Sequence, residues 1–181
     1  MAWDEALFGW LYDAVRRRRE PARTPEQRLR EARLEPLLPR LRLLASALGE
    51  RSLEVREAEG DGSFRDDVIF LPQALDFGAD AERNLLAYVV RVAFVTTAMR
   101  CAPFVLSDSA DPDERAIAAV AVADVVLAAL RDELPAAYEG CVSLGAEALA
   151  GRLGPLGSRQ AALDTWAAAR LGLPLAEEAQ A

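Results

Sequence analysis

Histidine and lysine are both missing from this chain of 181 residues, and cysteine occurs only twice, at Cys101 and Cys141. Without histidine the chain cannot form a seryl or cysteinyl triad that depends on a histidine base. Without lysine it cannot form a Walker A loop around a nucleotide phosphate, and it contains no Gly-x-Gly-x-x-Gly motif either. These absences favour a helical interaction module over an enzyme.

The two cysteines lie 40 positions apart and form no Cys-x-x-Cys pair. A zinc site without histidine would need an unusual mixture of sulfur and carboxylate ligands. We therefore expect two reduced structural thiols, no metal and no cofactor. Cys141 follows a glycine, but no base accompanies it in the sequence, so we expect this thiol to be buried rather than reactive.

Composition indicates a soluble globular protein. Hydrophobic residues make up 52% of the chain, and the net charge of −8 opposes non-specific binding to nucleic acid or anionic membranes. The longest apolar run, Ala116–Leu130, has 15 residues and contains Asp124. Because a membrane helix needs about 20 apolar residues, this run is too short to cross a bilayer. The first residues are acidic where a signal peptide is basic, so we expect a cytoplasmic location.

The first predicted helix spans Trp3–Arg19 and places apolar residues, Trp10 among them, at helical spacing. It ends in a run of four arginines, whose charge suits the negative end of a helix dipole. The candidate partner-binding residues of the chain are Trp3, Trp10, Arg16, Arg17, Arg18 and Arg19. The alternative for the arginines is a solvated helix end that pairs with nearby acids.

Capping and periodicity predict the remaining helices. Thr24-Pro25-Glu26-Gln27 and Asp111-Pro112-Asp113-Glu114 each provide a cap, a proline at the first helical position and a residue that closes a capping box. The expected spans after Thr24 are the leucine-rich stretch 37–48 closed by Gly49, a central helix 81–100 that is apolar on nearly every side, 111–134, 135–152, and a last helix from Ser158 that carries Leu163, Trp166 and Leu171.

A change of period after Ser52 predicts the only β structure. Asp61-Gly62 lies between two short β-prone runs, which indicates a hairpin near 52–71 that Pro72 ends. The predicted fold is mainly α: about six or seven helices in a bundle-like array with one small β-hairpin. Residues 1–175 are expected to form a single domain and 176–181 a disordered tail.

Two groups of acids raise a chemical interpretation. The stretch Asp108–Glu114 resembles a calcium loop only in its charge, since it lacks the glycine and the distant glutamate of an EF-hand. Asp124 lies inside an apolar helix, where a buried carboxylate would be a candidate acid or base. Its helical neighbours include Ala121 and Arg131, a face of small and charged residues, so we expect Asp124 to be exposed.

The segment from Val68 to Phe77, which contains Leu71-Pro72, is followed by Asn84-Leu85-Leu86-Ala87-Tyr88. Together they resemble the N-terminal region of the NorD-like family, the nitric-oxide-reductase activation protein D family. Its members resemble this chain in an initial tryptophan-containing helix, a leucine- and arginine-rich helix, a β element that ends in Leu-Pro-Pro, and an Asn-x-x-x-Tyr helix. The resemblance covers roughly residues 1–100, and the chain departs from it in having glutamine after Pro72.

Members of that family carry a C-terminal von Willebrand A domain and work with a MoxR-type AAA+ ATPase to activate or assemble metalloenzymes. This chain has no such domain or metal motif. The resemblance therefore implies either the N-terminal portion of a longer protein or a stand-alone relative that kept the adaptor part. It implies a protein-binding role and carries over no individual site residue.

The favoured function is a non-catalytic interaction or adaptor module in a bacterial MoxR-type AAA+ ATPase-linked activation or assembly system. Its partner would be an AAA+ ATPase or a von Willebrand A protein, with no role for nucleic acid. A regulatory domain that senses a small molecule or a peptide in a pocket between helices is the alternative. A carboxylate-based enzyme is a further alternative, although no pair stands out among the 29 acidic residues.

Overall fold

The computed structural model describes residues 29–58, 62–76, 78–101, 112–149 and 159–172. Of these, 69% are α-helical, so the prediction of a mainly α protein is confirmed. The described part holds five α-helices, fewer than the six or seven expected. The helix expected over Trp3–Arg19 and the tail 176–181 lie outside the described residues. Of the helix expected from Thr24 through Leu34, Leu29 and Arg30 are helical, but the rest of the expectation is wrong, because Ala32–Arg33 form a strand that pairs with Ala74–Leu75. The β structure is therefore not confined to the region after Ser52.

The described helices lie where periodicity and capping predict them. They are α3 (Leu38–Gly49), α4 (Ala81–Cys101), α5 (Pro112–Glu133), α6 (Pro135–Leu149) and α7 (Arg159–Arg170), with a 3-10 helix η1 (Glu35–Leu37) before α3. α5 and α6 both begin with proline, whose missing N–H costs no helical hydrogen bond at that position. At the end of α3 the left-handed residue is Glu50 rather than Gly49. Gly49 gives room instead, because a Cβ there would lie 2.6 Å from Cδ1 of Leu53.

Two small sheets form the β part. The larger has the order β2 (Glu54–Ala58), β4 (Val68–Pro72), β3 (Ser63–Arg65), and the smaller pairs β1 (Ala32–Arg33) antiparallel with β5 (Ala74–Leu75). A hairpin is present in the expected region, but the expected pairing of its strands is wrong. The two predicted runs are β2 and β4, which pair in parallel, and the hairpin is β3–β4.

The turn was misplaced because Asp61-Gly62 is the stronger turn signal. Gly62 does have a positive φ of 100°, but it is the last residue before β3 in the link from β2, and β2 and β3 lie on opposite sides of β4. The hairpin turns at Asp66–Asp67, where Asp66 has φ 53°. Aspartate enters the left-handed region more readily than most residues, so this turn needs no glycine.

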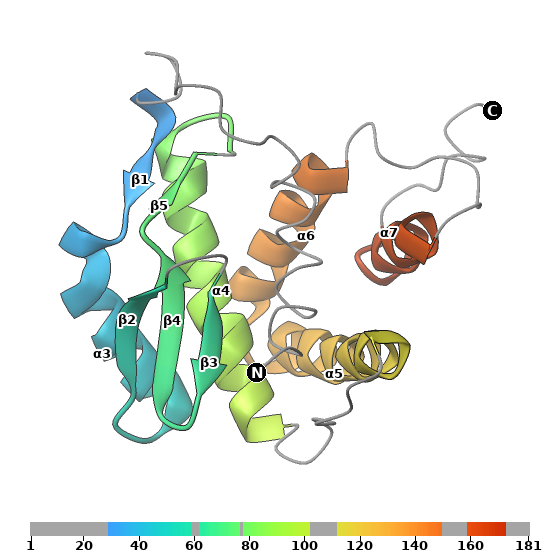
Figure 1. The fold of residues 1–181 in the computed structure, drawn as a ribbon, viewed down its shortest axis with the longest axis horizontal. Helices are drawn as coiled ribbons and strands as arrows, with labels where there is room; N and C mark the ends of the chain where they lie inside the picture. The colour runs from blue at the N-terminus through green and yellow to red at the C-terminus, as the bar shows by residue number, and fades with distance from the viewer. Residues whose placement is uncertain (1–28, 59–61, 77, 102–111, 150–158, 173–181) are drawn as a thin grey trace.

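α4 is the centre of the core. The three-stranded sheet and α3 lie on one side of it, and α5 and α6 lie on the other (Figure 1). Every residue from Val90 to Ala98 is buried, as predicted for a helix that others surround. α4 is the one described helix long and apolar enough to cross a membrane, but 67% of its apolar window is buried inside the protein. That burial is consistent with the core helix of a soluble protein.

α6 approaches its neighbours through glycines. A Cβ at Gly140 would lie 2.6 Å from Cγ2 of Val90 on α4, and a Cβ at Gly145 would collide with Cδ1 of Leu171, just after α7. Both glycines are buried. The distances between α6 and these two partners are therefore set by the absence of a side chain.

Arginine–carboxylate pairs join α4 to the helices beside it. Arg83 pairs with Glu147 of α6, and Arg100 pairs with Glu133 of α5. The hydrogen bond to Glu133 raises the pKa of Arg100 above its ordinary value. Arg100 also donates to the carbonyl oxygen of Leu48 at 3.3 Å, near the end of α3. Because these pairs are partly exposed, each contributes about 0–1 kcal/mol to stability.

Replacing Gly140 with alanine should lower the free energy of unfolding, measured by urea denaturation. Alanine favours a helix interior by about 1 kcal/mol, but its methyl group would meet the stiff, buried side chain of Val90. Overpacking of this kind costs about 1–3 kcal/mol. Gly145→Ala is the matched control and should cost less, because the end of the Leu171 side chain can rotate away. Equal losses at the two positions would contradict this account of the α4–α6 contact.

Candidate functional site

The candidate partner-binding residues Trp3, Trp10 and Arg16 to Arg19 all lie outside the described residues. The structure therefore neither brings them together nor separates them. It does describe where that part of the chain joins the folded body, beginning at Leu29. The candidate site is built from this junction inwards.

Asp80 sets the register of α4. Its Oδ1 accepts a hydrogen bond from the backbone N–H of Arg83 at 2.8 Å, as an N-cap residue does. With the start of the helix fixed, Asn84 and Tyr88 lie about one turn apart on the same face. Both are fully buried, each with 0% exposure.

Asn84 connects two segments of backbone to α4. Its Oδ1 accepts a hydrogen bond from the N–H of Gly78 at 2.9 Å, which closes the turn before the helix. Its Nδ2 donates to the carbonyl oxygens of Arg30 at 2.8 Å and Asp80 at 3.1 Å. Gly78 has no room for a side chain, because a Cβ there would lie 2.7 Å from the Cβ of Arg83.

Tyr88 continues the same connection one turn later. Its hydroxyl donates to the carbonyl oxygen of Pro72 at 2.8 Å and lies 3.5 Å from that of Ala32. Pro72 is the last residue of β4, and Ala32 belongs to β1. We call Asn84 and Tyr88, with their backbone partners in Arg30, Ala32 and Pro72, the N-terminal anchor.

The anchor contains three of the residues quoted for the NorD-like resemblance, Pro72, Asn84 and Tyr88. Leu71-Pro72 and Asn84-x-x-x-Tyr88 are separate in the sequence, and the hydroxyl of Tyr88 joins them. The Asn84 side chain and the Tyr88 hydroxyl bond to backbone atoms in the interior, so this motif has a structural role. The i, i+4 spacing of Asn84 and Tyr88 is visible in the sequence, but other buried polar residues lie on α4 as well, so the spacing alone does not reveal the backbone partners.

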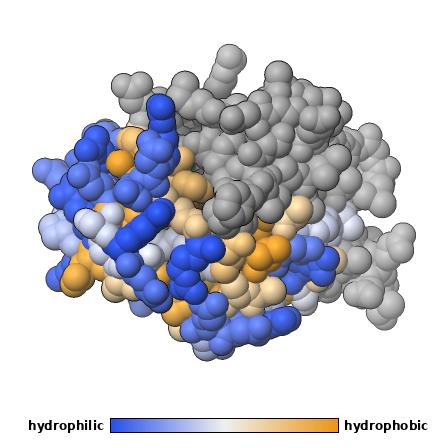
Figure 2. Space-filling model, turned by 90° about the horizontal axis from the view of Figure 1, so that it is seen from below, coloured by the Kyte–Doolittle hydropathy of each residue, from blue (hydrophilic) through white to orange (hydrophobic). Residues whose placement is uncertain are grey.

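Apolar side chains are exposed at four described positions. The large hydrophobic residues concerned are Leu29, Leu43, Leu85 and Val125. On the face seen from below, Figure 2 shows hydrophobic residues in the middle of the described surface and hydrophilic residues around them. Leu29 is the most exposed at 82%, and it immediately precedes the anchor.

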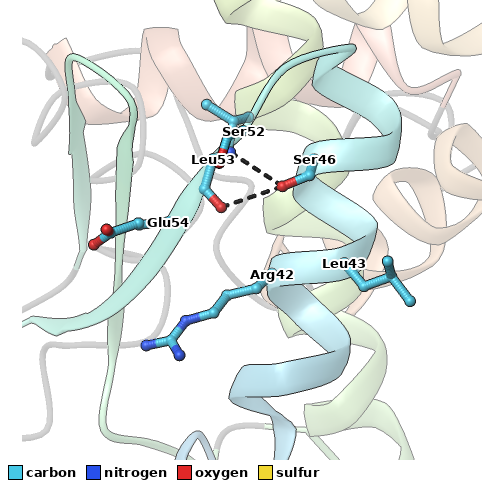
Figure 3. A pocket seen from close by; sticks show the side chains of 6 residues that line it. All are labelled: Arg42, Leu43, Ser46, Ser52, Leu53 and Glu54. Carbon is cyan, nitrogen blue, oxygen red and sulfur yellow. Dashed lines mark hydrogen bonds between the residues drawn. The ribbon is translucent and has the colours of Figure 1, made fainter.

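A shallow hollow of about 520 Å³ lies between α3 and β2 (Figure 3). Its lining residues are Arg42, Leu43, Ser46, Ser52, Leu53 and Glu54. Ser46 Oγ accepts a hydrogen bond from the N–H of Leu53 at 3.0 Å and donates to its carbonyl oxygen at 3.3 Å. Arg42 Nε donates to the carbonyl oxygen of Val55 at 3.2 Å.

These hydrogen bonds shield the edge of β2. The N–H of Glu54 bonds to the carbonyl oxygen of Asp67 on the side of β4, so the backbone groups of Leu53 and Val55 point outward. α3 covers them, which is one way in which proteins protect an edge strand. Ser46 is bonded in both directions, and Glu54 pairs with Arg56 at 2.6 Å. The described contacts of Ser46 thus cover the strand edge, and those of Glu54 form a surface ion pair.

The titratable groups singled out from the sequence lie apart from the anchor. Cys141 is buried, as predicted, and burial raises the pKa of its thiol to about 12, whereas Cys101 is exposed. Asp124 is partly exposed, and its Oδ2 lies 2.6 Å from the guanidinium of Arg170 at the end of α7. Sequence reasoning considered only neighbours on the same helix and missed this partner.

The acidic stretch Asp108–Glu114, for which a calcium site was considered and not favoured, falls largely beyond what the structure describes, since Asp108 to Asp111 and the side chains after them are not described. Among the described residues, no group of three or more histidine, cysteine, aspartate or glutamate side chains is arranged to hold a metal ion. No protein-family model, curated protein or solved structure matches this chain. The NorD-like resemblance thus remains an interpretation of the residues quoted for it.

Tyr88→Phe should lower the free energy of unfolding by about 1–3 kcal/mol, because it leaves the buried carbonyl oxygen of Pro72 without its donor. Chemical denaturation measures the loss. Tyr138→Phe is the matched control, since Tyr138 is half-buried and its hydroxyl makes no hydrogen bond to a described residue. A loss of stability no greater than that of the control would contradict the role given to the Tyr88 hydroxyl.

In the native protein at mildly alkaline pH, iodoacetamide should modify Cys101 and leave Cys141 unmodified, because the thiolate is the reactive form.

The unfolded chain releases the Cys141 proton at a pKa of about 8.5, whereas the folded chain retains it until about 12. Raising the pH between these values therefore favours unfolding, and Cys141→Ala should reduce that dependence. Mass spectrometry of the labelled protein gives the first result, and denaturation at several pH values gives the second. Rapid native modification of Cys141 would contradict its burial.

Proposed function

We propose that this chain is a non-catalytic protein-interaction module, an adaptor in a bacterial activation or assembly system linked to a MoxR-type AAA+ ATPase. The observation that carries the proposal is the N-terminal anchor. Three of the residues quoted for the NorD-like resemblance, Pro72, Asn84 and Tyr88, belong to this unit, and the unit holds the point where the N-terminal segment enters the fold. The use of that segment for protein binding is what the resemblance implies.

The chemistry of the anchor supports binding more than catalysis. A catalytic pair of polar side chains has to reach a substrate, whereas Asn84 and Tyr88 are fully buried and bond to backbone carbonyls. The function would then depend on the residues outside the anchor that can contact a partner protein. The tryptophans and arginines that precede Leu29 are residue types suited to protein contact, because tryptophan and arginine are enriched among the residues that dominate binding energy.

The alternative of a sensing domain would place its ligand in the hollow beside α3. Its volume is about 520 Å³, but it is shallow and largely open, whereas small-ligand sites are concave and bury most of the ligand. It lies between a helix and the shielded edge of β2, rather than between helices as the sequence-based alternative supposed. A ligand there would have to bind beside Arg42 and Ser46 without breaking the bonds that cover the strand.

The adaptor proposal predicts a direct complex between the full chain and the MoxR-type ATPase, or the von Willebrand A protein, encoded in the same genome. Isothermal titration with the purified proteins measures it. We expect Trp3→Ala/Trp10→Ala and, separately, alanine at Arg16 to Arg19 to weaken binding at least about tenfold, which is about 1.4 kcal/mol.

Leu43→Ala is the control for that titration, because it removes an exposed apolar side chain on α3 and should leave the affinity unchanged. Failure of the wild-type chain to bind either protein would remove the adaptor proposal. In that case, thermal stabilisation by a metabolite or peptide, abolished by Arg42→Ala, would favour the sensing alternative.

A further inference from the structure

The exposed side of α3 carries positive charge and no negative charge. Arg40 and Arg42 are both exposed, α3 contains no acidic residue, and the nearest acids in the chain, Glu35 and Glu50, lie before and after the helix. Arg40 makes no hydrogen bond or ion pair to a described residue, and Arg42 uses only its Nε, which bonds to the carbonyl oxygen of Val55. Most other described arginines pair with a carboxylate. The charge of α3 is therefore left without a neutralising partner.

An apolar row runs between these two arginines. Pro39, Leu43 and Ala47 repeat every four residues, so they lie one above another on the helix, and all three are exposed. Leu43 has the largest exposed apolar side chain of the row, at 73%. Helical geometry places Arg40 on one side of the row and Arg42 on the other. Figure 3 shows Arg42 extending towards β2 and Leu43 extending away from it. We call these five residues the α3 face.

The α3 face matches a partner helix that is apolar in the middle and acidic along both edges. The apolar residues of an amphipathic helix recur at i, i+3, i+4 and i+7, a spacing that packs against the row around Leu43. Carboxylates along its edges would meet Arg40 and the Nη atoms of Arg42, and paired hydrogen bonds from one guanidinium to a carboxylate are a strong form of such contact. The shallow hollow beside Arg42 leaves room for that carboxylate, since Glu54 in its lining already pairs with Arg56.

Other occupants match the α3 face less well. A partner strand cannot add to β2 here, because Ser46 and Arg42 already bond to the outward backbone groups of that strand. A second copy of this chain would set the arginines of one α3 against those of the other. A nucleic acid or an anionic membrane would meet a chain of net charge −8.

We infer that the α3 face is a docking surface for an acidic amphipathic helix of a partner protein. Leu43 contacts the apolar residues of that helix, and Arg40 and Arg42 bind its carboxylates. The inference uses none of the residues 1–28 in which the partner-binding residues of the adaptor proposal lie. It therefore goes beyond the proposed function and can fail separately from it.

A displayed library of amphipathic helices tests the inference. The library keeps an apolar stripe constant, varies the flanking positions among glutamate, glutamine and lysine, and is selected for binding to the full chain. We expect the selected helices to be acidic. Fluorescence anisotropy with the corresponding synthetic peptides should give dissociation constants that rise with salt concentration, because salt screens exposed charge pairs. Replacing their glutamates with glutamine should weaken binding at least about tenfold.

Variants of the chain locate the surface. Arg40→Glu should weaken binding of the acidic peptides at least about tenfold, and Leu43→Ala should also weaken it. Peptides with lysine in place of glutamate should bind Arg40→Glu more tightly than they bind the wild-type chain. Since Arg40 makes no bond in the described structure, its replacement leaves the cover of β2 intact. Arg65→Glu is the matched control, because Arg65 is an exposed arginine on β3, across β4 from β2, and should leave the affinity unchanged.

A selection that yields no binder or helices without an excess of glutamate would overturn the inference, as would equal binding of the acidic peptides to Arg40→Glu and Arg65→Glu. Binding lost in Arg42→Ala but complete in Arg40→Glu would place the ligand in the hollow alone and would also overturn it.

The Trp3→Ala/Trp10→Ala variant should bind the acidic peptides as the wild-type chain does. If these peptides bind but neither the ATPase nor the von Willebrand A protein does, the α3 face stands and the proposed function falls. If the ATPase binds and no acidic helix is selected, the proposed function stands and the inference falls.

Discussion

A buried polar group without a hydrogen-bond partner costs about 1–3 kcal/mol, and this cost governs the arrangement around α4. Asn84 and Tyr88 place an amide and a hydroxyl on one fully buried face of the central helix. Backbone groups of Arg30, Pro72, Gly78 and Asp80 bond to them, with Ala32 at the limit of reach. The entry of the chain, the end of β4 and the turn before α4 must therefore meet at this face. These hydrogen bonds therefore determine how the described N-terminal segment, the end of β4 and the turn before α4 pack against that helix.

A second constraint operates at the other end of the sheet. β2 is an edge strand, and an uncovered edge invites pairing with another chain. α3 prevents this with Ser46 and Arg42, which lie about one turn apart and bond to the outward backbone groups of Leu53 and Val55. The hollow in Figure 3 is what remains beside this cover. The same contacts thus explain a small surface depression and the isolation of the sheet.

The candidate site shows how far residue patterns go. The pattern Asn84-x-x-x-Tyr88 was recognisable, but its role was not, because its partners are carbonyl oxygens whose positions no side-chain pattern records. Asp124 shows the same limit of sequence patterns for a partly exposed side chain. Its partner Arg170 lies 46 positions away on another helix, so spacing along α5 could not reveal it. The partner-binding residues proposed from the sequence, Trp3 and Trp10 among them, remain a prediction.

The sequence by itself determined the helices α3 to α7. Proline at the start of α5 and α6, and the apolar character of α4 on nearly every side, are local properties that short stretches of chain specify. The tertiary structure decided the strand pairing, because parallel contact between β2 and β4 depends on how β3 returns on the far side of β4. It also decided the use of Gly140 and Gly145, which weaken a helix locally and are explained only by the close approach of Val90 and Leu171. Local propensity acts within a few residues, whereas packing acts between segments that the fold alone brings together.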